Sequence, residues 1–214
     1  MTKLRKGLLI AFEGIDGAGK STQAKLLYER LKKAGFKAVF SKEPTEGEWG
    51  QKLKKLIEKG RNVTPQEELE WFIKDRQQHV EKTIIPGLNE KKIIILDRYY
   101  FSTIAYQGAL GFDPGEIERK NLEFAPQPDL LFLIEITPHL GLRRIIEDRE
   151  KEADHFEKEG YLLQVNKNFN ELKKPFLHRL PGEEKIQRLS DRTWNIAARY
   201  LKEHHLIENR VKSF

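Results

Sequence analysis

Between residues 14 and 21 the chain reads Gly14-Ile15-Asp16-Gly17-Ala18-Gly19-Lys20-Ser21, which matches the pattern G-x-x-x-x-G-K-[ST] at every fixed position. Glycines allow the backbone to curl so that successive N–H groups point at phosphate oxygens. The lysine of this pattern contacts the β- and γ-phosphates of a nucleotide, and the final hydroxyl ligates Mg²⁺. We therefore expect Mg–ATP at this loop, bound by the residues Gly14, Asp16, Gly17, Ala18, Gly19, Lys20, Ser21 and Thr22.

The sequence on either side of the loop supports this interpretation. An apolar run of strand length, Leu8–Phe12, precedes it, and Ala24, Leu27 and Leu31 follow with the spacing of one helix face, which Gly35 would end. A strand, a loop and a helix in this order are the context that the pattern requires. The alternative is a glycine-rich turn that binds no ligand, and it does not account for this context.

Further apolar runs occur along the chain, with helical patterns between them. Their unbroken apolar character indicates burial on both faces, as in a parallel sheet. Strands that alternate with helices predict right-handed βαβ units and an α/β fold of the P-loop type, with three layers (αβα) around a five-stranded parallel sheet. The strong strand candidates are Leu8–Phe12, Ile93–Leu96 and Leu130–Ile136, and the weaker ones are Ala38–Ser41 and Lys185–Leu189.

The 214 residues fit one domain, and no internal repeat or low-complexity tract divides them. Thr64-Pro65 and Thr137-Pro138 each predict a helix start, with a hydroxyl N-cap and a proline in the first turn. The charged stretch Asp148–Glu159 looks like a mobile insertion, at about residues 148–160 of the single domain 1–214.

Composition narrows the class of protein. Hydrophobic residues make up 38% and charged residues 34%, which is typical of a folded polar domain. The absence of cysteine excludes disulfides and thiolate metal sites. The first apolar run is too short for a signal peptide or a membrane span, so we expect a cytoplasmic protein without a membrane partner. The net charge of +6 would also suit nucleic-acid binding, but basic and acidic residues are interspersed, and we expect no nucleic-acid partner.

A second polar site follows the apolar run Ile93–Leu96, where Asp97 and Arg98 stand at the expected end of a buried strand. A carboxylate in this position can hold the metal of a P-loop enzyme, usually through water. The arginine beside it can clamp transferring phosphates with two parallel hydrogen bonds. A simple ion pair at the strand end is the alternative, which the nearby phosphate-binding loop disfavours.

The segment after Arg98 has a helical pattern in which Ser102 and Tyr106 share one face. A tyrosine in such a place can pack against a sugar or a base edge. From spacing alone, Tyr106 would more often be a core residue, and both interpretations stay open at this point.

Together these residues resemble the thymidylate kinase family, whose members phosphorylate dTMP to dTDP with ATP. The resemblance spans about residues 8 to 149. The stretches that carry it, in order, are Phe12-Glu13-Gly14-Ile15-Asp16-Gly17-Ala18-Gly19-Lys20-Ser21-Thr22-Gln23, Glu43-Pro44, Phe72 with Asp75-Arg76, and Asp97-Arg98-Tyr99 followed by Ser102 and Ala105-Tyr106-Gln107-Gly108.

The resemblance implies roles for several side chains. Asp16 looks like the carboxylate that accepts a hydrogen bond from the 3′-hydroxyl of the acceptor deoxyribose. Phe72 resembles the aromatic residue that stacks on thymine, and Arg76, one helical turn later, would read the base edge or hold its phosphate. Tyr106 would pack under the deoxyribose, where a 2′-hydroxyl would clash. The substrate residues implied in full are Asp16, Lys42, Phe72, Arg76, Arg98, Ser102, Tyr106 and Gln107.

This sequence departs from the family pattern at two positions. Lys42 stands where the family often has an arginine for the acceptor phosphate, and lysine lacks the bidentate fork. Gly17 stands where some members carry an arginine aimed at the γ-phosphate, and members without it supply one from a lid. The resemblance therefore implies that the insertion at about residues 148–160 forms a short helical lid. Arg143, Arg144 and Arg149 are the candidates here, and we favour Arg149.

The expected reaction is in-line transfer of the γ-phosphoryl group to a phosphate oxygen of dTMP. That phosphate has a second pKa of about 6 and needs no general base at neutral pH. Catalysis would rest on Lys20, Asp97, Arg98 and Arg149, with Ser21 and Asp97 holding Mg²⁺. The family resemblance also implies a homodimer.

Other functions remain as alternatives. One is a kinase for another nucleoside monophosphate or for a small-molecule acceptor. Another is a regulatory nucleotide switch, but the guanine motif of such switches is missing, since Asn166-Lys167 is followed by Asn168-Phe169.

Overall fold

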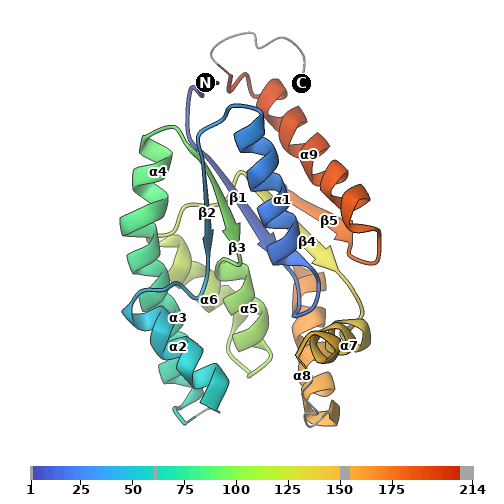
Figure 1. The fold of residues 1–214 in the computed structure, drawn as a ribbon. Coiled ribbons are helices and arrows are strands. Elements are labelled where there is room, and N and C mark those ends of the chain that lie inside the picture. Colours follow the sequence, from blue (N-terminus) through green and yellow to red (C-terminus); the bar gives the residue numbers. More distant parts are fainter. Residues whose placement is uncertain (1, 60–61, 150–154, 208–214) are drawn as a thin grey trace.

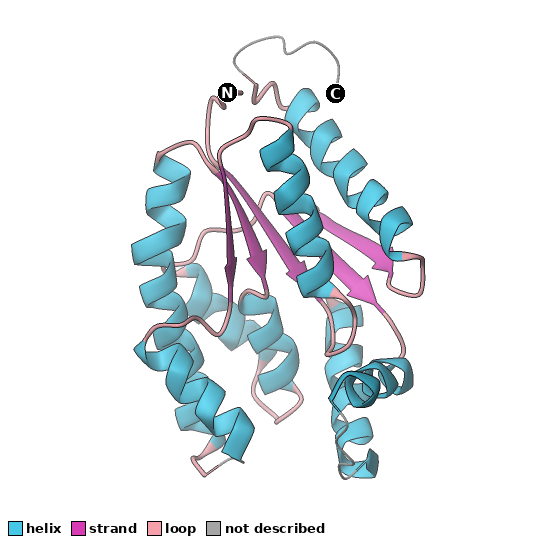
Figure 2. Ribbon diagram, viewed as in Figure 1, coloured by secondary structure: helices cyan, strands magenta, loops and turns pink. Residues whose placement is uncertain are grey.

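Five parallel strands form one sheet in the order β2-β3-β1-β4-β5, with helices on both faces (Figures 1 and 2). The computed structural model describes residues 2–59, 62–149 and 155–207. The architecture confirms the three-layer α/β fold expected from the sequence. The strands are β1 (Leu8–Glu13), β2 (Ala38–Lys42), β3 (Ile93–Asp97), β4 (Leu130–Glu135) and β5 (Leu177–Pro181).

The three central strands are buried because helices cover both of their faces. Every residue of β1 and β3 is buried, and each buried leucine or isoleucine side chain contributes about 1.5–3 kcal/mol. Phe12 of β1 lies opposite Asp97 of β3 and Phe132 of β4, and the two phenylalanine rings are 5.0 Å apart. Since parallel strands end at the same edge of a sheet, this register brings Glu13, Lys42 and Asp97 to one carboxyl edge.

One strand expectation is wrong. Residues 185–189 do not form a strand, because α9 begins at Ile186, and the fifth strand is Leu177–Pro181 instead. Ile186 and Leu189 are three residues apart, a spacing that belongs to a helix face. The true edge strand is only half-buried and carries polar residues such as His178, so it lacks the continuous apolar run of its neighbours.

Helices α1 (Lys20–Lys33) and α9 (Ile186–Glu203) lie side by side over one face of the sheet (Figure 1). Arg30 joins them, since its guanidinium is 2.6 Å from Asp191 and 4.6 Å from the centre of the Trp194 ring. Gly35 ends α1 with φ +86°, as expected from the sequence. Three further helices are α2 (Glu48–Lys59), α5 (Tyr100–Gly108) and α6 (Pro114–Leu122).

The expected helix start at Thr64 is confirmed. Helix α3 (Pro65–His79) has a capping box in which the Thr64 hydroxyl accepts from the Glu67 N–H and the Glu67 carboxylate accepts from the Thr64 N–H. A π-helical turn (Val80–Ile84) and α4 (Ile85–Asn89) continue the same rod.

Helix α7 begins at Pro138, as expected, and ends at Arg149, and α8 runs from His155 to Glu171. The expected lid at about 148–160 therefore includes the end of α7 and the start of α8, and residues 150–154 of it lie outside the described part of the chain. Helix α8 binds α5 directly. Asn168 donates to the Ala105 carbonyl at 2.8 Å, and the Tyr161 hydroxyl donates to the Tyr106 carbonyl at 2.9 Å.

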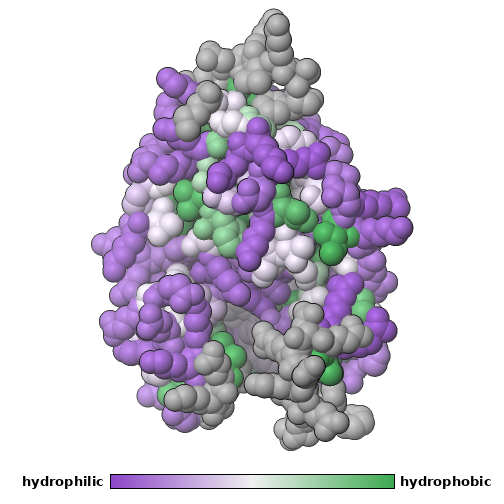
Figure 3. Space-filling view, in the orientation of Figure 1, coloured by the Kyte–Doolittle hydropathy of each residue, from purple (hydrophilic) through white to green (hydrophobic). Residues whose placement is uncertain are grey.

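The surface in Figure 3 is mostly hydrophilic, and it is hollowed between the end of the molecule formed by α2 and α3 and the end formed by α7 and α8. This hollow lies at the carboxyl edge of the sheet, where the loop Gly14–Ser21 leads into α1. No helix within the described ranges is long and apolar enough to cross a membrane.

Candidate active site

The loop Gly14–Ser21 joins β1 to α1 and requires glycine at two close approaches. Gly14 has φ +140°, and a Cβ there would lie 2.4 Å from the Ile134 carbonyl oxygen. Gly17 has φ +77°, and a Cβ there would lie 2.4 Å from the Gly141 carbonyl oxygen. A Cβ at either place would force the neighbouring backbone to move, so both positions require glycine.

The lysine of the loop is buried with 6% of its surface exposed, and its Nζ donates to the Ile15 carbonyl at 2.7 Å. Burial and then the charge of Arg98 lower the pKa of Lys20 to about 8. The ammonium therefore stands beside the loop backbone in a setting that favours an anionic partner. Of the other loop residues, Ala18 is buried and Thr22 is exposed.

Ser21 and Asp97 lie together, although 76 positions separate them in the chain. The Ser21 hydroxyl donates to Asp97 Oδ2 at 2.5 Å. The other oxygen, Oδ1, is buried and has no hydrogen-bond partner among the described residues. An unpaired buried carboxylate oxygen beside a hydroxyl is an oxygen donor set of the kind that Mg²⁺ prefers, so these residues fit the expected metal.

Nowhere in the described ranges do three acidic or imidazole side chains gather as a metal site. Mg²⁺ in nucleotide enzymes is often bound by one or two protein groups together with substrate phosphates and water, rather than by a protein cage. The pairing of one serine and one aspartate agrees with that mode.

Arg98, Asp16 and Tyr106 form a connected cluster beside the loop. Arg98 Nη2 is 2.5 Å from Asp16 Oδ1, and the Tyr106 hydroxyl donates to Asp16 Oδ2 at 3.0 Å. The guanidinium also lies 5.1 Å from the centre of the Tyr106 ring. The attraction of Arg98 and Lys20 outweighs the effect of partial burial and lowers the pKa of Asp16 to about 2. At neutral pH this carboxylate is therefore ionised and can accept a hydrogen bond from a hydroxyl group.

Arg98 has φ +73°, which is uncommon for a residue other than glycine. Its backbone N–H donates to the Phe12 carbonyl at 3.0 Å, and its Nη1 donates to the Ser102 hydroxyl at 2.8 Å. The unusual backbone turns the side chain back toward the loop, while α5 starts two residues later.

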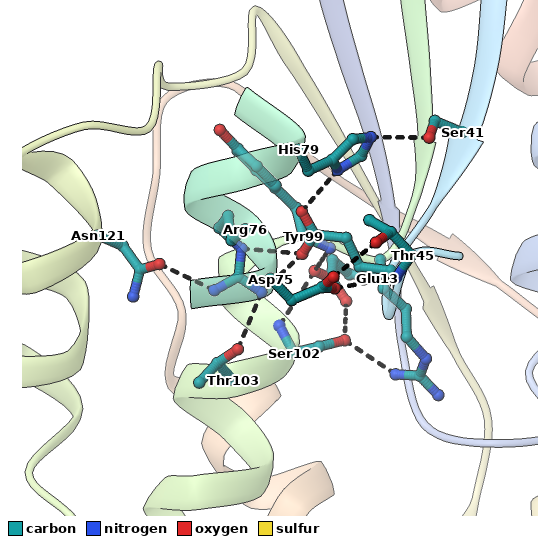
Figure 4. A network of polar contacts seen from close by, with 12 residues as sticks. Glu13, Ser41, Thr45, Asp75, Arg76, His79, Tyr99, Ser102, Thr103 and Asn121 are labelled. Atoms are coloured by element: carbon teal, nitrogen blue, oxygen red, sulfur yellow. Dashed lines mark hydrogen bonds and ion pairs between the residues drawn. The ribbon is translucent and has the colours of Figure 1, made fainter. Parts of the chain in front are cut away.

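Glu13, to which no role was assigned from the sequence, lies among these groups. It is fully buried and accepts hydrogen bonds from the backbone and the hydroxyl of Ser102 and from the Tyr99 N–H (Figure 4). Burial raises the pKa of Glu13 to about 7, against the opposing effect of Arg98. Glu13 directly precedes Gly14 in the sequence, but the sequence does not show that its partners are Tyr99 and Ser102.

A second buried network lies where β2 ends (Figure 4). Arg76 is 2% exposed and donates to Glu43 at 2.8 and 2.6 Å, to Asn121 and to Thr103. His79 bridges Glu43 Oε1 at 2.9 Å and the Ser41 hydroxyl at 2.7 Å. Burial opposes the ionisation of Glu43, but Arg76 and then His79 outweigh it and lower its pKa.

The loop after β2 is pinned by Asp75, whose carboxylate accepts from the Thr45 N–H at 2.9 Å and from its hydroxyl at 2.5 Å. Lys42 is exposed at the sheet edge, in register with Asp97. Phe72 is half-buried on α3. Gln107 is buried, donates to Glu68 at 3.2 Å, and leaves its carbonyl oxygen without a partner among the described residues.

The candidate lid arginines differ in their placement. Arg144 donates to the Gly17 carbonyl at 3.2 Å and to the Gly182 carbonyl at 3.1 Å, so it touches the phosphate loop. Arg143 is exposed on the same helix. Arg149 is the last residue of α7, and its side chain lies outside the described part of the structure.

Comparison with known proteins agrees with this geometry. The sequence model of the family described as thymidylate kinase matches residues 12–200. The chain is 47% identical over 180 residues to a thymidylate kinase of Desulfotalea psychrophila, covering 84% of this chain and 89% of the relative. It is 38% identical over 190 residues to that of Brachyspira hyodysenteriae, covering 89% and 93%.

The fold is also similar to a crystal structure of thymidylate kinase from Ehrlichia chaffeensis. The TM-score is 0.72 at 29% identity, with 89% of this chain and 98% of that chain covered. Sequence and fold agree over most of the length, and the motifs of the loop and of the Asp97–Arg98 turn lie within the matched region. The chain therefore belongs to the thymidylate kinase family.

Proposed function

We propose that this chain transfers the γ-phosphoryl group of ATP to the phosphate of dTMP, giving ADP and dTDP. The observation that carries the proposal is the cluster of Asp16, Arg98 and Tyr106 beside the phosphate loop. It combines an ionised carboxylate for a sugar hydroxyl, an arginine for phosphate and an aromatic ring for the sugar, all within contact of one another.

The donor half of the site would be built by the loop Gly14–Ser21 and the start of α1. Backbone N–H groups would hold the phosphates of ATP, and Lys20 would exchange its bond to the Ile15 carbonyl for the β- and γ-phosphates. Ser21 and Asp97 would hold Mg²⁺, directly and through water. Bound there, Mg²⁺ would neutralise part of the charge on the β- and γ-phosphates.

The acceptor half would face the same cluster from α3 and α5. Asp16 would accept from the 3′-hydroxyl, and the Tyr106 ring would exclude a 2′-hydroxyl. Phe72 would stack on the base, and Arg76, fixed by Glu43, would read the base edge or hold the phosphate of dTMP. Lys42 would approach the acceptor phosphate as a point charge, while Ser102 and Gln107 would complete the pocket.

The acceptor phosphate needs no general base, because it is mostly a dianion near neutral pH. Positioning and charge neutralisation by Lys20 and Arg98 would then supply the rate. A lid arginine would complete the charge. Arg149 remains our sequence-based candidate, and Arg144 is a second one, supported by its contact with the loop carbonyl.

The test is formation of dTDP from dTMP and Mg–ATP, followed by chromatography, for the wild type and for Lys20→Ala. The variant should lose phosphoryl transfer without loss of stability, because removing a buried ammonium relieves a desolvation penalty. Wild-type turnover by the variant would overturn the phosphate role of Lys20. The alternative function is a kinase for another nucleoside monophosphate. The cytoplasmic location remains a prediction from the sequence.

A further inference from the structure

Glu13 is a buried carboxylate that no step of the proposed reaction uses. It is the last residue of β1, has 0% of its surface exposed, and directly precedes Gly14, the first residue of the phosphate loop. A buried carboxylate is costly unless several donors satisfy it. Its partners therefore indicate what it is there to hold.

All of these partners lie at the start of α5, in its N-cap residue Tyr99 and in Ser102 of its first turn. Oε1 accepts from the Tyr99 N–H at 2.7 Å and from the Ser102 N–H at 3.0 Å, and Oε2 accepts from the Ser102 hydroxyl at 2.5 Å (Figure 4). The Ser102 hydroxyl in turn accepts from Arg98 Nη1 at 2.8 Å. One carboxylate thus reaches the arginine of the site through a single serine.

The contacts also explain how the start of α5 is stabilised. Tyr99 is the N-cap of this helix and provides no side-chain cap of its own. Glu13 accepts from the N–H groups of the N-cap and of the third helical residue, so it supplies from a neighbouring strand the acceptor that a capping residue normally provides. A negative charge is also favoured at a helix N-terminus.

We propose that Glu13 is a positioning residue for phosphoryl transfer: it fixes the turn that carries Arg98 to the start of the phosphate loop and, through Ser102, orients the guanidinium between Asp16 and Tyr106. The inference rests on the proposed role of Arg98 as the phosphate clamp. Since Glu13 and Gly14 are adjacent, the loop for the donor and the arginine for the transferred group share one anchor.

The direction of a single hydrogen bond makes the inference testable. The Ser102 hydroxyl has one hydrogen, and giving it to Glu13 leaves the lone pairs of Oγ for Arg98. In Glu13→Gln the amide oxygen can still accept from the two backbone N–H groups, but the amide nitrogen must donate to Ser102. The amide N–H then competes with Arg98 for the lone pairs of Oγ, and the hydroxyl hydrogen loses its carboxylate acceptor, while the shape of the side chain is kept.

The experiment compares Glu13→Gln and Ser102→Ala with a matched surface control, Glu29→Gln, whose side chain is exposed on α1. Steady-state kinetics at pH 8 with Mg–ATP and dTMP would give kcat and both KM values. We expect Glu13→Gln to lower kcat/KM for dTMP by about 10- to 100-fold, the cost of a misplaced group, and to change KM for ATP by less than about twofold. The control should match the wild type.

The same substitutions are then made in an Arg98→Ala background. If Glu13 acts through Arg98, Glu13→Gln should lower kcat/KM by no more than about twofold in that background, because the two changes break one pathway. If the fold-losses in kcat/KM from Glu13→Gln and Arg98→Ala multiply in the double variant, Glu13 has a general structural role and the proposal is overturned. Wild-type kcat/KM for Glu13→Gln alone would overturn it as well.

Two further results are distinguishable from these. If Glu13→Gln does not fold, Ser102→Ala carries the same comparison, since it breaks the link to Arg98 and leaves the backbone contacts of Glu13 in place. If Arg98→Ala keeps wild-type turnover, the clamp of the proposed function fails, and the reason for anchoring Arg98 fails with it.

Discussion

The side chains that carry the proposed chemistry are charged groups held in or beside the core, and each is compensated by a neighbour. Lys20 donates to a backbone carbonyl, and Arg98 donates to both Asp16 and Ser102. Because these partners are fixed by β1 and β3, little reorganisation is needed when phosphates arrive. Electrostatic groups that are already oriented are the main source of catalysis in phosphoryl transfer.

Burial of Glu13 has a cost that depends on pH. The pKa of this carboxyl is about 7 in the folded protein and 4.5 in the unfolded chain, so folding favours the protonated form. A raised folded pKa contributes stability below pH 4.5 that is lost as pH rises through 7. Between pH 5 and pH 8 the wild type should therefore lose about 2–3 kcal/mol relative to Glu13→Gln, which does not titrate.

Denaturant unfolding of both proteins at pH 5, 6, 7 and 8 measures this difference. The free energy of unfolding of the glutamine variant should increase relative to that of the wild type as pH rises, even where the variant is the slower enzyme. A constant difference across this range would show that Glu13 keeps an ordinary pKa.

At the scale of elements, features set by neighbouring residues could be predicted from the sequence, whereas features that depend on long-range contacts could not. The N-cap at Thr64, the proline starts of α3 and α7 and the buried runs of β1, β3 and β4 follow from neighbouring residues, and they were predicted. The edge strand Leu177–Pro181 was missed because it is short and half-buried, and its pattern resembles a loop. Ile186 and Leu189 were assigned to a strand although their spacing is helical.

The capping box of α3 gives a direct test at this scale. Thr64→Ala removes the hydroxyl that accepts from Glu67 and should lower the free energy of unfolding by about 1 kcal/mol. Gln66→Ala, an exposed change in the same turn, should stay within about 0.5 kcal/mol of the wild type. Equal effects of the two substitutions in urea denaturation would show that the cap adds nothing.

The candidate site was likewise only partly predictable. The sequence places Asp16, Lys20, Ser21, Asp97 and Arg98 in recognisable motifs, and the structure brings them together. The anchors are different, because Glu13 finds its partners 86 to 89 positions away and His79 finds Ser41 38 positions away. No local pattern reports a hydrogen bond across such distances, and only the register of the strands brings these groups into contact.

At the scale of the whole molecule, the surface has a hollow between α2–α3 and α7–α8 (Figure 3). The loop Gly14–Ser21 and the turn at Arg98 lie at its base, at the carboxyl edge of the sheet. Ligands of α/β folds bind at this edge, so the position of the site follows from the topology.

The homodimer implied by the family resemblance is a prediction for the intact molecule, with α3 and its continuation as the expected interface. Light scattering after size exclusion should give twice the 25.1 kDa of one chain. Ile85→Glu should shift the protein toward the monomer, because Ile85 is an exposed apolar residue on this rod. Ile186→Glu, at an exposed position of α9, is the matched control and should leave the dimer intact. A monomeric wild type would contradict the prediction.

The most direct test of the account is ATP-dependent phosphorylation of dTMP, dUMP, UMP, CMP, AMP and GMP under one set of conditions with Mg²⁺. The account predicts that kcat/KM is highest for dTMP, about 10- to 200-fold lower for dUMP, which lacks only a methyl group, and lower again for the four ribonucleotides. Equal use of UMP and dUMP would contradict the role of Tyr106 against a 2′-hydroxyl. Phosphorylation of none of the six would leave the phosphate loop in place and overturn the assignment of the acceptor.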